Sequence, residues 1–139
     1  MRRLPVPALP RVVRYGSVLL VAAVIAYFSL TGRPPRVPDA GPWWDKRLHL
    51  VAYAGLGLAL AYATLDERRL WLRVAVILGA VFVYGSGIEL VQWTLPRRYF
   101  GVGDILANLA GGVVATAWLA LERVVRYVPL PSGVTVEES

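Results

Sequence analysis

Four apolar runs of nearly membrane-spanning length constrain this chain more than any other feature. They cover residues 15–32, 48–65, 70–95 and 104–121. A helix needs about 20 predominantly apolar residues to cross a hydrocarbon core roughly 30 Å thick, and each run approaches that length. The last run extends as a predicted helix to Tyr127, before the prolines that come after it. We therefore predict an all-α, four-helix transmembrane bundle over residues 15–127.

Composition supports a membrane protein and restricts its partners. Of 139 residues, 57% are hydrophobic, whereas a soluble domain has about 45–50%. The chain has no cysteine, which excludes disulfides, thiolate metal sites and a cysteine nucleophile. The net charge is +6, but the arginines stand in short clusters between apolar runs, where they meet anionic headgroups. We expect the lipid bilayer as a partner, and no nucleic acid.

The chain divides into three parts. Residues 1–14 are a basic cytoplasmic segment, residues 15–127 the membrane domain, and residues 128–139 a polar tail. The first apolar run comes after a basic start, as in a signal peptide. It has no small-x-small cleavage site and is nearly long enough to span, so we predict a retained first helix.

Lysines and arginines predict the orientation. With four spans, the amino terminus, the middle turn and the carboxyl tail share one side. That side carries nine basic residues: Arg2, Arg3, Arg11, Arg14, Arg68, Arg69, Arg73, Arg123 and Arg126. The other side carries six: Arg33, Arg36, Lys46, Arg47, Arg97 and Arg98. The positive-inside rule places both termini in the cytoplasm of a multi-pass plasma-membrane protein.

On this topology, three separate segments bring polar residues to the outer membrane face. The second helix starts with Asp45, Lys46, Arg47 and the sole histidine, His49. The other polar residues at this face are Glu89, Gln92, Arg97, Arg98, Asp104 and Asn108. A carboxylate inside a span costs roughly 2.5–3.5 kcal/mol at the centre, so we expect Glu89 to face the bundle interior or a wet cavity.

Helical spacing brings these residues onto shared faces. Residues three or four apart lie on one helix face, which joins His49 with Tyr53, Glu89 with Gln92, and Asp104 with Asn108. Small residues repeat at the same spacing in two stripes, Gly55, Ala59 and Ala63, and Ala107, Gly111 and Ala115. Such stripes let membrane helices approach closely. We predict that His49 and Glu89 share one polar pocket at the outer ends of the second and third helices.

Two stretches carry a family resemblance. "DKRLHLVAYAGLG" and "GIELVQWTLPRRYFGVGDILANLAGG" resemble the VanZ-like family of small membrane proteins, over about residues 45–115. The family pattern is Asp-Lys with His and Tyr, then Glu-x-x-Gln with Arg, then Asp-x-x-x-Asn-x-x-Gly. It falls on Asp45, Lys46, His49, Tyr53, Glu89, Gln92, Arg97 or Arg98, Asp104, Asn108, and Gly111 or Gly112. The resemblance implies an integral membrane protein of a family named for a member linked to teicoplanin resistance.

Two functions stay open, and so does the question of enzymatic activity. In the first, the protein binds an anionic lipid or lipid-linked cell-wall intermediate, with phosphate held by the basic residues Lys46, Arg47, Arg97 and Arg98. Candidate catalytic residues are His49 as proton donor and Glu89 or Asp104 as base. The other candidate binding residues are Asp45, Tyr53, Gln92 and Asn108. In the second, the polar residues only fix helix packing or a partner protein.

Simpler roles compete for several of these residues. An oxygen-rich metal site from Asp45, Glu89 and Asp104, with His49 as fourth ligand, is conceivable. Carboxylates beside basic residues are equally well neutralised as ion pairs, and we predict no bound metal and no cofactor. Asp104 is also a candidate cap of the fourth helix, and Glu122 is expected to be a solvated flanking charge. The aromatic residues Trp43, Trp44, Trp93 and Tyr99 are expected to form an interfacial belt.

Overall fold

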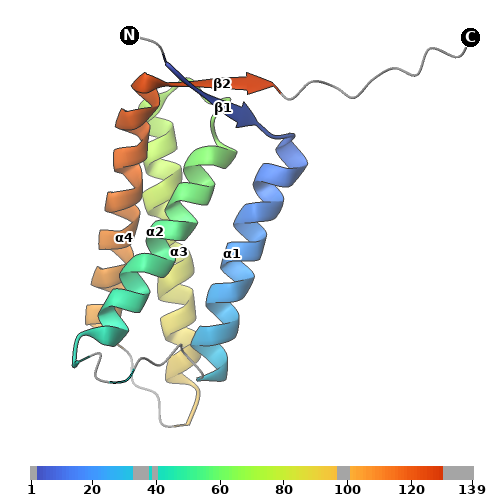
Figure 1. The fold of residues 1–139 in the computed structure, drawn as a ribbon. Helices are drawn as coiled ribbons and strands as arrows, with labels where there is room; N and C mark the ends of the chain where they lie inside the picture. The colour runs from blue at the N-terminus through green and yellow to red at the C-terminus, as the bar shows by residue number, and fades with distance from the viewer. Residues whose placement is uncertain (1–2, 33–37, 39–40, 97–100, 130–139) are drawn as a thin grey trace, which may run out of the picture.

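The computed structural model describes residues 3–32, 38, 41–96 and 101–129. Four long helices pack side by side, and two strands lie across one end of the bundle (Figure 1). The helices are α1 (Arg11–Thr31), α2 (Trp44–Ala63), α3 (Leu70–Trp93) and α4 (Val102–Leu121). The strands are β1 (Leu4–Ala8) and β2 (Val125–Pro129), with a 3-10 turn, η1 (Glu122–Val124), before β2. We call the end that carries the strands the strand end, and the opposite end the cluster end.

The predicted number and order of helices are confirmed, and so is the apolar character of three of them. Within the described residues, the segments 11–31, 70–93 and 102–124 are long and apolar enough to cross a membrane. Helix α2 is not in this set, because it starts at Trp44, four residues earlier than predicted. Its first turns therefore include the charged residues that precede the apolar run.

The predicted continuation of the fourth helix to Tyr127 is wrong. Helix α4 ends at Leu121, and after the 3-10 turn the chain forms β2. Strand β2 pairs in parallel with β1, in a register from Leu4 opposite Val125 to Ala8 opposite Pro129. Valines favour a strand here. The partner strand lies at the other end of the sequence, so local periodicity could not reveal it.

A buried arginine closes the strand end against α2. The side chain of Arg14 is 4% exposed and donates to the backbone oxygens of Leu9, Tyr62 and Ala63 at 3.0, 3.3 and 3.1 Å. Two of these oxygens belong to the last turn of α2, whose carbonyls have no partner within the helix. Arg14 also donates to Asp66 at 2.7 Å, and this hydrogen bond is the first cause of a lowered Asp66 pKa.

A second buried arginine joins α2, α3 and the residues after α4. Arg73 donates to both carboxylate oxygens of Glu122, at 2.6 and 2.9 Å, and to the Ala61 oxygen at 2.6 Å. The expectation that Glu122 is a solvated charge is therefore wrong. Tyr127 also donates to Glu122, at 2.8 Å; burial, and then this bond to a carboxylate, raises the Tyr127 pKa to about 12.

Helices α2 and α4 share the most extensive contact of any helix pair. A Cβ at Gly111 would lie 2.7 Å from the Ala54 nitrogen and closer still to the Leu50 oxygen, so the two backbones touch. This confirms the predicted small-residue contact on α4. On α2 a Cβ added at Gly55 would meet nothing within 4 Å, whereas one added at Gly57 would collide with Ala115, so Gly57 rather than Gly55 makes the close approach. Close approach of α2 and α4 is what brings their polar first turns together.

We predict that Gly111→Ala destabilises the protein, by about 1–3 kcal/mol, because the added methyl group must push α2 and α4 apart. Gly79→Ala is the matched control, since a Cβ at Gly79 meets nothing within 4 Å. Thermal unfolding of both variants in lipid nanodiscs measures the difference. Equal unfolding temperatures for the two variants would contradict the close helix contact.

Candidate functional site

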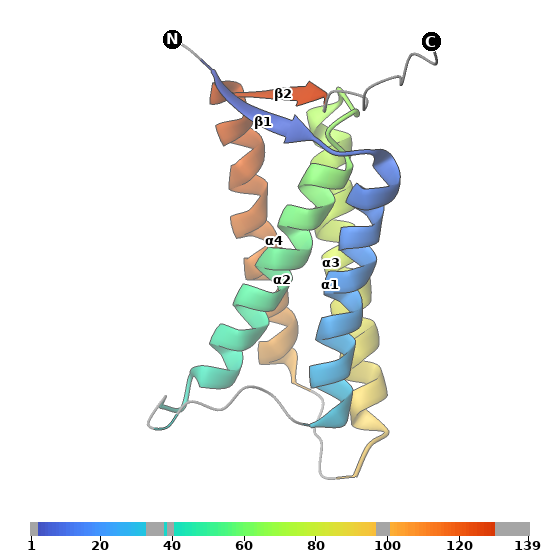
Figure 2. The ribbon, with the colours of Figure 1, turned by 45° about the vertical axis from the view of Figure 1, so that its right-hand side comes forward.

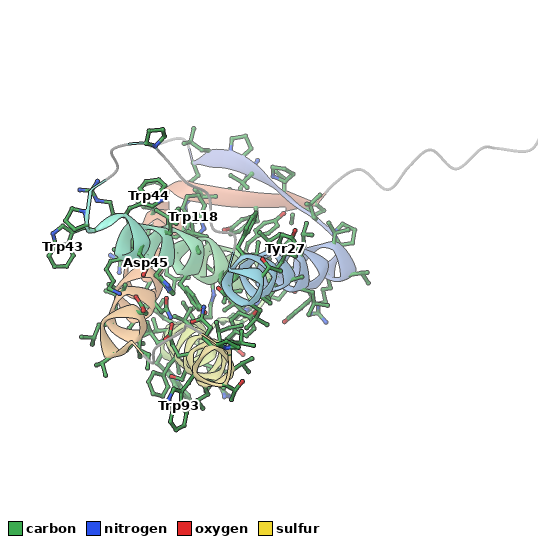
Figure 3. The ribbon with its side chains drawn as sticks, turned by 90° about the horizontal axis from the view of Figure 1, so that it is seen from below. Tyr27, Trp43, Trp44, Asp45, Trp93 and Trp118 are labelled. Carbon is green, nitrogen blue, oxygen red and sulfur yellow. The ribbon has the colours of Figure 1, made fainter. Side chains whose placement is uncertain are left out.

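The polar residues gather at the cluster end, opposite the strands. The amino-terminal turns of α2 and α4 and the carboxyl-terminal turns of α3 meet there (Figures 1 and 2). Seen from this end, Asp45 lies on the side of α2 that faces α4, while Trp43 and Trp93 point away from the bundle (Figure 3). The two tryptophans are 65% and 67% exposed, as expected of an interfacial belt. We call Asp45, Lys46, His49, Glu89, Asp104 and Asn108 the polar cluster.

An ion pair ties the first turn of α2 to the first turn of α4. The Lys46 ammonium donates to Asp104 Oδ1 and lies 3.5 Å from Asp45 Oδ2. The side chain of Asp104 is only 14% exposed. Asp104 does not cap α4 as expected, because the cap position is Gly101 and Asp104 stands within the first turn. Its Oδ1 accepts from Lys46 on α2, while its Oδ2 lies beside Gly101 at the start of its own helix.

His49 is oriented by an amide on the neighbouring helix. Its Nδ1 lies 2.9 Å from Oδ1 of Asn108, whose side chain is 1% exposed. An amide oxygen only accepts, so the hydrogen of this bond is on Nδ1. The Nε2 atom then faces two carboxylates, 3.9 Å from Asp45 Oδ1 and 3.8 Å from Asp104 Oδ1. A neutral His49 ring thus presents its Nε2 lone pair to the space between two acids.

Glu89 is the most deeply buried acid of the polar cluster, at 1% exposure. Its Oε2 accepts from the Gly101 backbone nitrogen at 3.2 Å, and its Oε1 has no hydrogen-bond partner among the described residues. A Cβ added at the same glycine would collide with Asp104 Oδ2, so this oxygen lies beside Gly101. Glu89 and His49 lie at the same end of the bundle, with no direct hydrogen bond between them, and Glu89 is not among the residues that line the cavity beside His49.

Tyr53 and Gly85 pack against the polar cluster from the interior of the bundle, next to His49 and Asn108. The Tyr53 ring lies parallel to the His49 ring at an interplanar angle of 6°, with centroids 6.4 Å apart. A Cβ at Gly85 would lie 2.7 Å from Asn108 Nδ2 and 3.2 Å from Tyr53 Cε1, so only glycine leaves room for both side chains. Sequence reasoning missed Gly85, although its spacing of four from Glu89 puts both on one face of α3.

Several of the predicted binding residues lie outside the polar cluster or cannot be placed. Gln92 is buried and donates to the Ser29 backbone oxygen at 2.8 Å, so it joins α3 to α1. Arg47 is exposed, and its side chain has no hydrogen bond or ion pair within the described part of the chain. Arg97 and Arg98, with the belt residue Tyr99, lie outside the described residues.

An apolar cavity of about 200 Å³ adjoins the polar cluster. It lies between α1, α2 and α3, and its apolar walls include Val24, Phe28 and Val51. Asp45 and His49 line the same cavity, so the polar and apolar surfaces are continuous. Sequence periodicity could not predict this cavity, because it arises from the packing of three helices.

The residues of this end can do three things chemically. Lys46 offers a positive charge to an anion, and the His49 ring can donate a proton to a bound ligand or accept one from it. Two carboxylate oxygens and one imidazole nitrogen also make a set of cation ligands: Asp45, His49 and Asp104 offer atoms that lie within 4.8 Å of one another. The sequence alone, by contrast, predicts that no metal binds.

Three helices able to span a membrane, with a partly buried polar cluster at one end, are the features of a small helical membrane protein. A comparison with models of protein families identifies the family. The model of the VanZ/LLP1 family matches residues 10–123, and the chain belongs to that family. The resemblance seen in the sequence is thereby confirmed. Searches of curated proteins and of solved structures find no match.

Proposed function

We propose that the protein is a multi-pass protein of the plasma membrane with four spans and both termini in the cytoplasm. The excess of basic residues on the strand side supports this orientation. Exposed tryptophans at both ends, Trp43 and Trp93 at the cluster end and Trp71 at the strand end, support a membrane-spanning position of the bundle. Helix α2 serves as the fourth span although it starts with charges, because Lys46 and His49 are turned toward partners on α4. The polar cluster then lies at the outer face.

Single cysteines test this topology, since the chain has none of its own. We expect a cysteine at Trp43 to react with a membrane-impermeant maleimide on intact cells. A cysteine at Glu67, in the turn at the strand end, should react only after the cells are permeabilised. The opposite pattern of labelling, or equal labelling of both positions, would contradict the proposed orientation.

The polar cluster is proposed to bind the anionic headgroup of a lipid or of a lipid-linked cell-wall intermediate. The observation that carries this proposal is the continuity of cluster and cavity through Asp45 and His49. An amphiphile needs both surfaces, a polar one for the headgroup and an apolar one for the chain. The Lys46 ammonium, 36% exposed beside the acids, is the phosphate contact from the described residues. Arg97 and Arg98 come after α3 in the sequence and are proposed to add to it.

The apolar cavity is proposed to hold the first part of the lipid chain. Its walls come from three helices, and Asp45 and His49 of the polar cluster are among the residues that line it. A lipid-linked cell-wall intermediate combines a phosphate with a long hydrocarbon chain, so it fits both surfaces. Binding such an intermediate is how a member of this family would influence sensitivity to a glycopeptide antibiotic such as teicoplanin.

One observation favours the second candidate function, in which the polar residues only hold the helices together. The bonds from Lys46 to Asp104 and from His49 to Asn108 both join α2 to α4. Interhelical hydrogen bonds of this kind contribute about 1 kcal/mol each. The two candidates differ in the effect of removing a polar group, because only a binding site loses its ligand while the fold persists.

Mass spectrometry of lipids that purify with the protein distinguishes the two candidate functions. We expect an anionic lipid to be enriched in the purified protein over its share in the membrane. The substitutions His49→Ala and Glu89→Gln should each reduce this enrichment about tenfold or more, because each removes a hydrogen bond to a charged group. Membrane levels and unfolding temperatures should stay close to those of the unchanged protein. Variants that are lost from the membrane or unfolded would instead support the structural function.

A matched pair of substitutions tests the cavity by itself. Ala52→Phe fills the cavity, whereas Val83→Phe adds the same aromatic side chain at a residue of α3 that is 70% exposed. We expect only the first to reduce the enrichment of the lipid. Equal enrichment in both variants would contradict a chain-binding role for the cavity.

A further inference from the structure

The charges of the polar cluster do not balance. It holds three carboxylates, on Asp45, Glu89 and Asp104, and one permanent cation, Lys46. Arg47 is exposed and takes no part. Asp45 is 59% exposed, whereas Asp104 and Glu89 are 14% and 1% exposed, and carboxylates as buried as these two are normally paired with cations or coordinate metals. One lysine cannot neutralise three acids, and an anionic ligand brought to the same place would add to the excess of negative charge.

His49 has the orientation of a metal ligand. Metal-binding histidines commonly donate their second ring nitrogen to an oxygen acceptor, which fixes the tautomer and aims the other nitrogen at the metal. The bond from His49 Nδ1 to the buried Asn108 amide has this form. It directs Nε2 between Asp45 and Asp104, at 3.9 and 3.8 Å from their oxygens. Those distances are too long for hydrogen bonds.

The same distances suit a shared cation. Metal bonds of about 2.1 Å hold ligand atoms roughly 3 to 4.2 Å apart, depending on the angle between them. The ligand atoms of Asp45, His49 and Asp104 all lie within 4.8 Å of one another. Small rotations of side chains at the start of two helices would therefore complete the coordination, without any change in the backbone.

Glu89 provides an independent indication of a ligand. It is 1% exposed, and its Oε1 has no hydrogen-bond partner among the described residues. On α3 it lies four residues after Gly85, and Gly85 touches Asn108 on α4. Glu89 therefore faces α4, where Gly101 separates its carboxylate from that of Asp104. A water molecule bound to a cation would supply the donor that Oε1 needs.

We propose that Asp45, His49 and Asp104 bind a divalent cation of the Mn²⁺ or Zn²⁺ class, with Glu89 bonded to its coordinated water. One imidazole nitrogen with two carboxylate oxygens suits these ions. The two positive charges neutralise the excess on the three acids. The cation site stands apart from lipid binding; only its further role, drawing a phosphate headgroup to an acidic cluster, rests on the proposed function.

Lys46 competes with the cation for the same carboxylates. Its ammonium donates to Asp104 and lies 3.5 Å from Asp45, so a cation must displace it. Removing this positive charge should tighten binding of the cation by about tenfold or more, since unit charges a few Å apart interact strongly near a protein surface. A purely structural cluster predicts the reverse, because Lys46 would then be its only internal counter-ion.

The test is a titration of the purified full chain with Mn²⁺, in nanodiscs of zwitterionic lipid that contribute no anionic headgroups. Electron paramagnetic resonance measures free Mn²⁺, and a parallel calorimetric titration uses Zn²⁺. We expect one ion per chain, with His49→Ala and Asp104→Asn each weakening binding about tenfold or more, and Lys46→Met strengthening it. Glu67→Gln, a carboxylate change at the strand end, should leave binding unchanged.

Unfolding temperatures without metal identify any variant that fails to fold. If neither ion binds the unchanged protein, or if Lys46→Met weakens binding while remaining folded, the cation site is wrong. Lipid enrichment without binding of either ion would refute the cation site and leave the proposed function standing. Binding of an ion without lipid enrichment would refute the proposed lipid-binding function and leave the cation site standing.

Discussion

The backbone contact between α2 and α4 is the interaction on which the rest of the structure depends. Gly111 lets the two helices touch, and Gly57 against Ala115 continues the contact along them. Only at this separation can Lys46 reach Asp104 and His49 reach Asn108. The polar cluster is therefore a consequence of helix packing: at wider helix spacing the same side chains would be two solvated charges and a free imidazole.

The two ends of the bundle use charge in different ways. At the strand end, Arg14 and Arg73 each bind carbonyl oxygens of α2 together with a carboxylate, so donors and acceptors match. In the polar cluster at the other end, three acids lie beside one lysine, and the buried Glu89 keeps an oxygen without a hydrogen bond to the described residues. The hydrogen bonds at the strand end stabilise the fold, whereas the cluster end keeps a carboxylate oxygen without a hydrogen bond among the described residues. For this reason we place the proposed binding function at the cluster end.

Hydrophobic run lengths were enough to predict four helices, and helical spacing was enough to pair Asp104 with Asn108 on one face. Spacing describes one helix at a time, however. It could not tell that Gly57, rather than Gly55, meets α4, or that Gly85 makes room for Asn108. Pairing of β1 with β2, and of Arg73 with Glu122, joins residues far apart in the sequence, and no local pattern encodes such partners.

Nitrogen-15 nuclear magnetic resonance of the histidine ring tests the central claim most directly, because His49 is the sole histidine and gives the only ring signals. The claim is that α4 orients His49 through Asn108 and turns Nε2 toward two acids. In the neutral ring, the account predicts a hydrogen on Nδ1 and none on Nε2. Added Zn²⁺ should then shift the Nε2 signal alone. A neutral ring with its hydrogen on Nε2 would contradict the account.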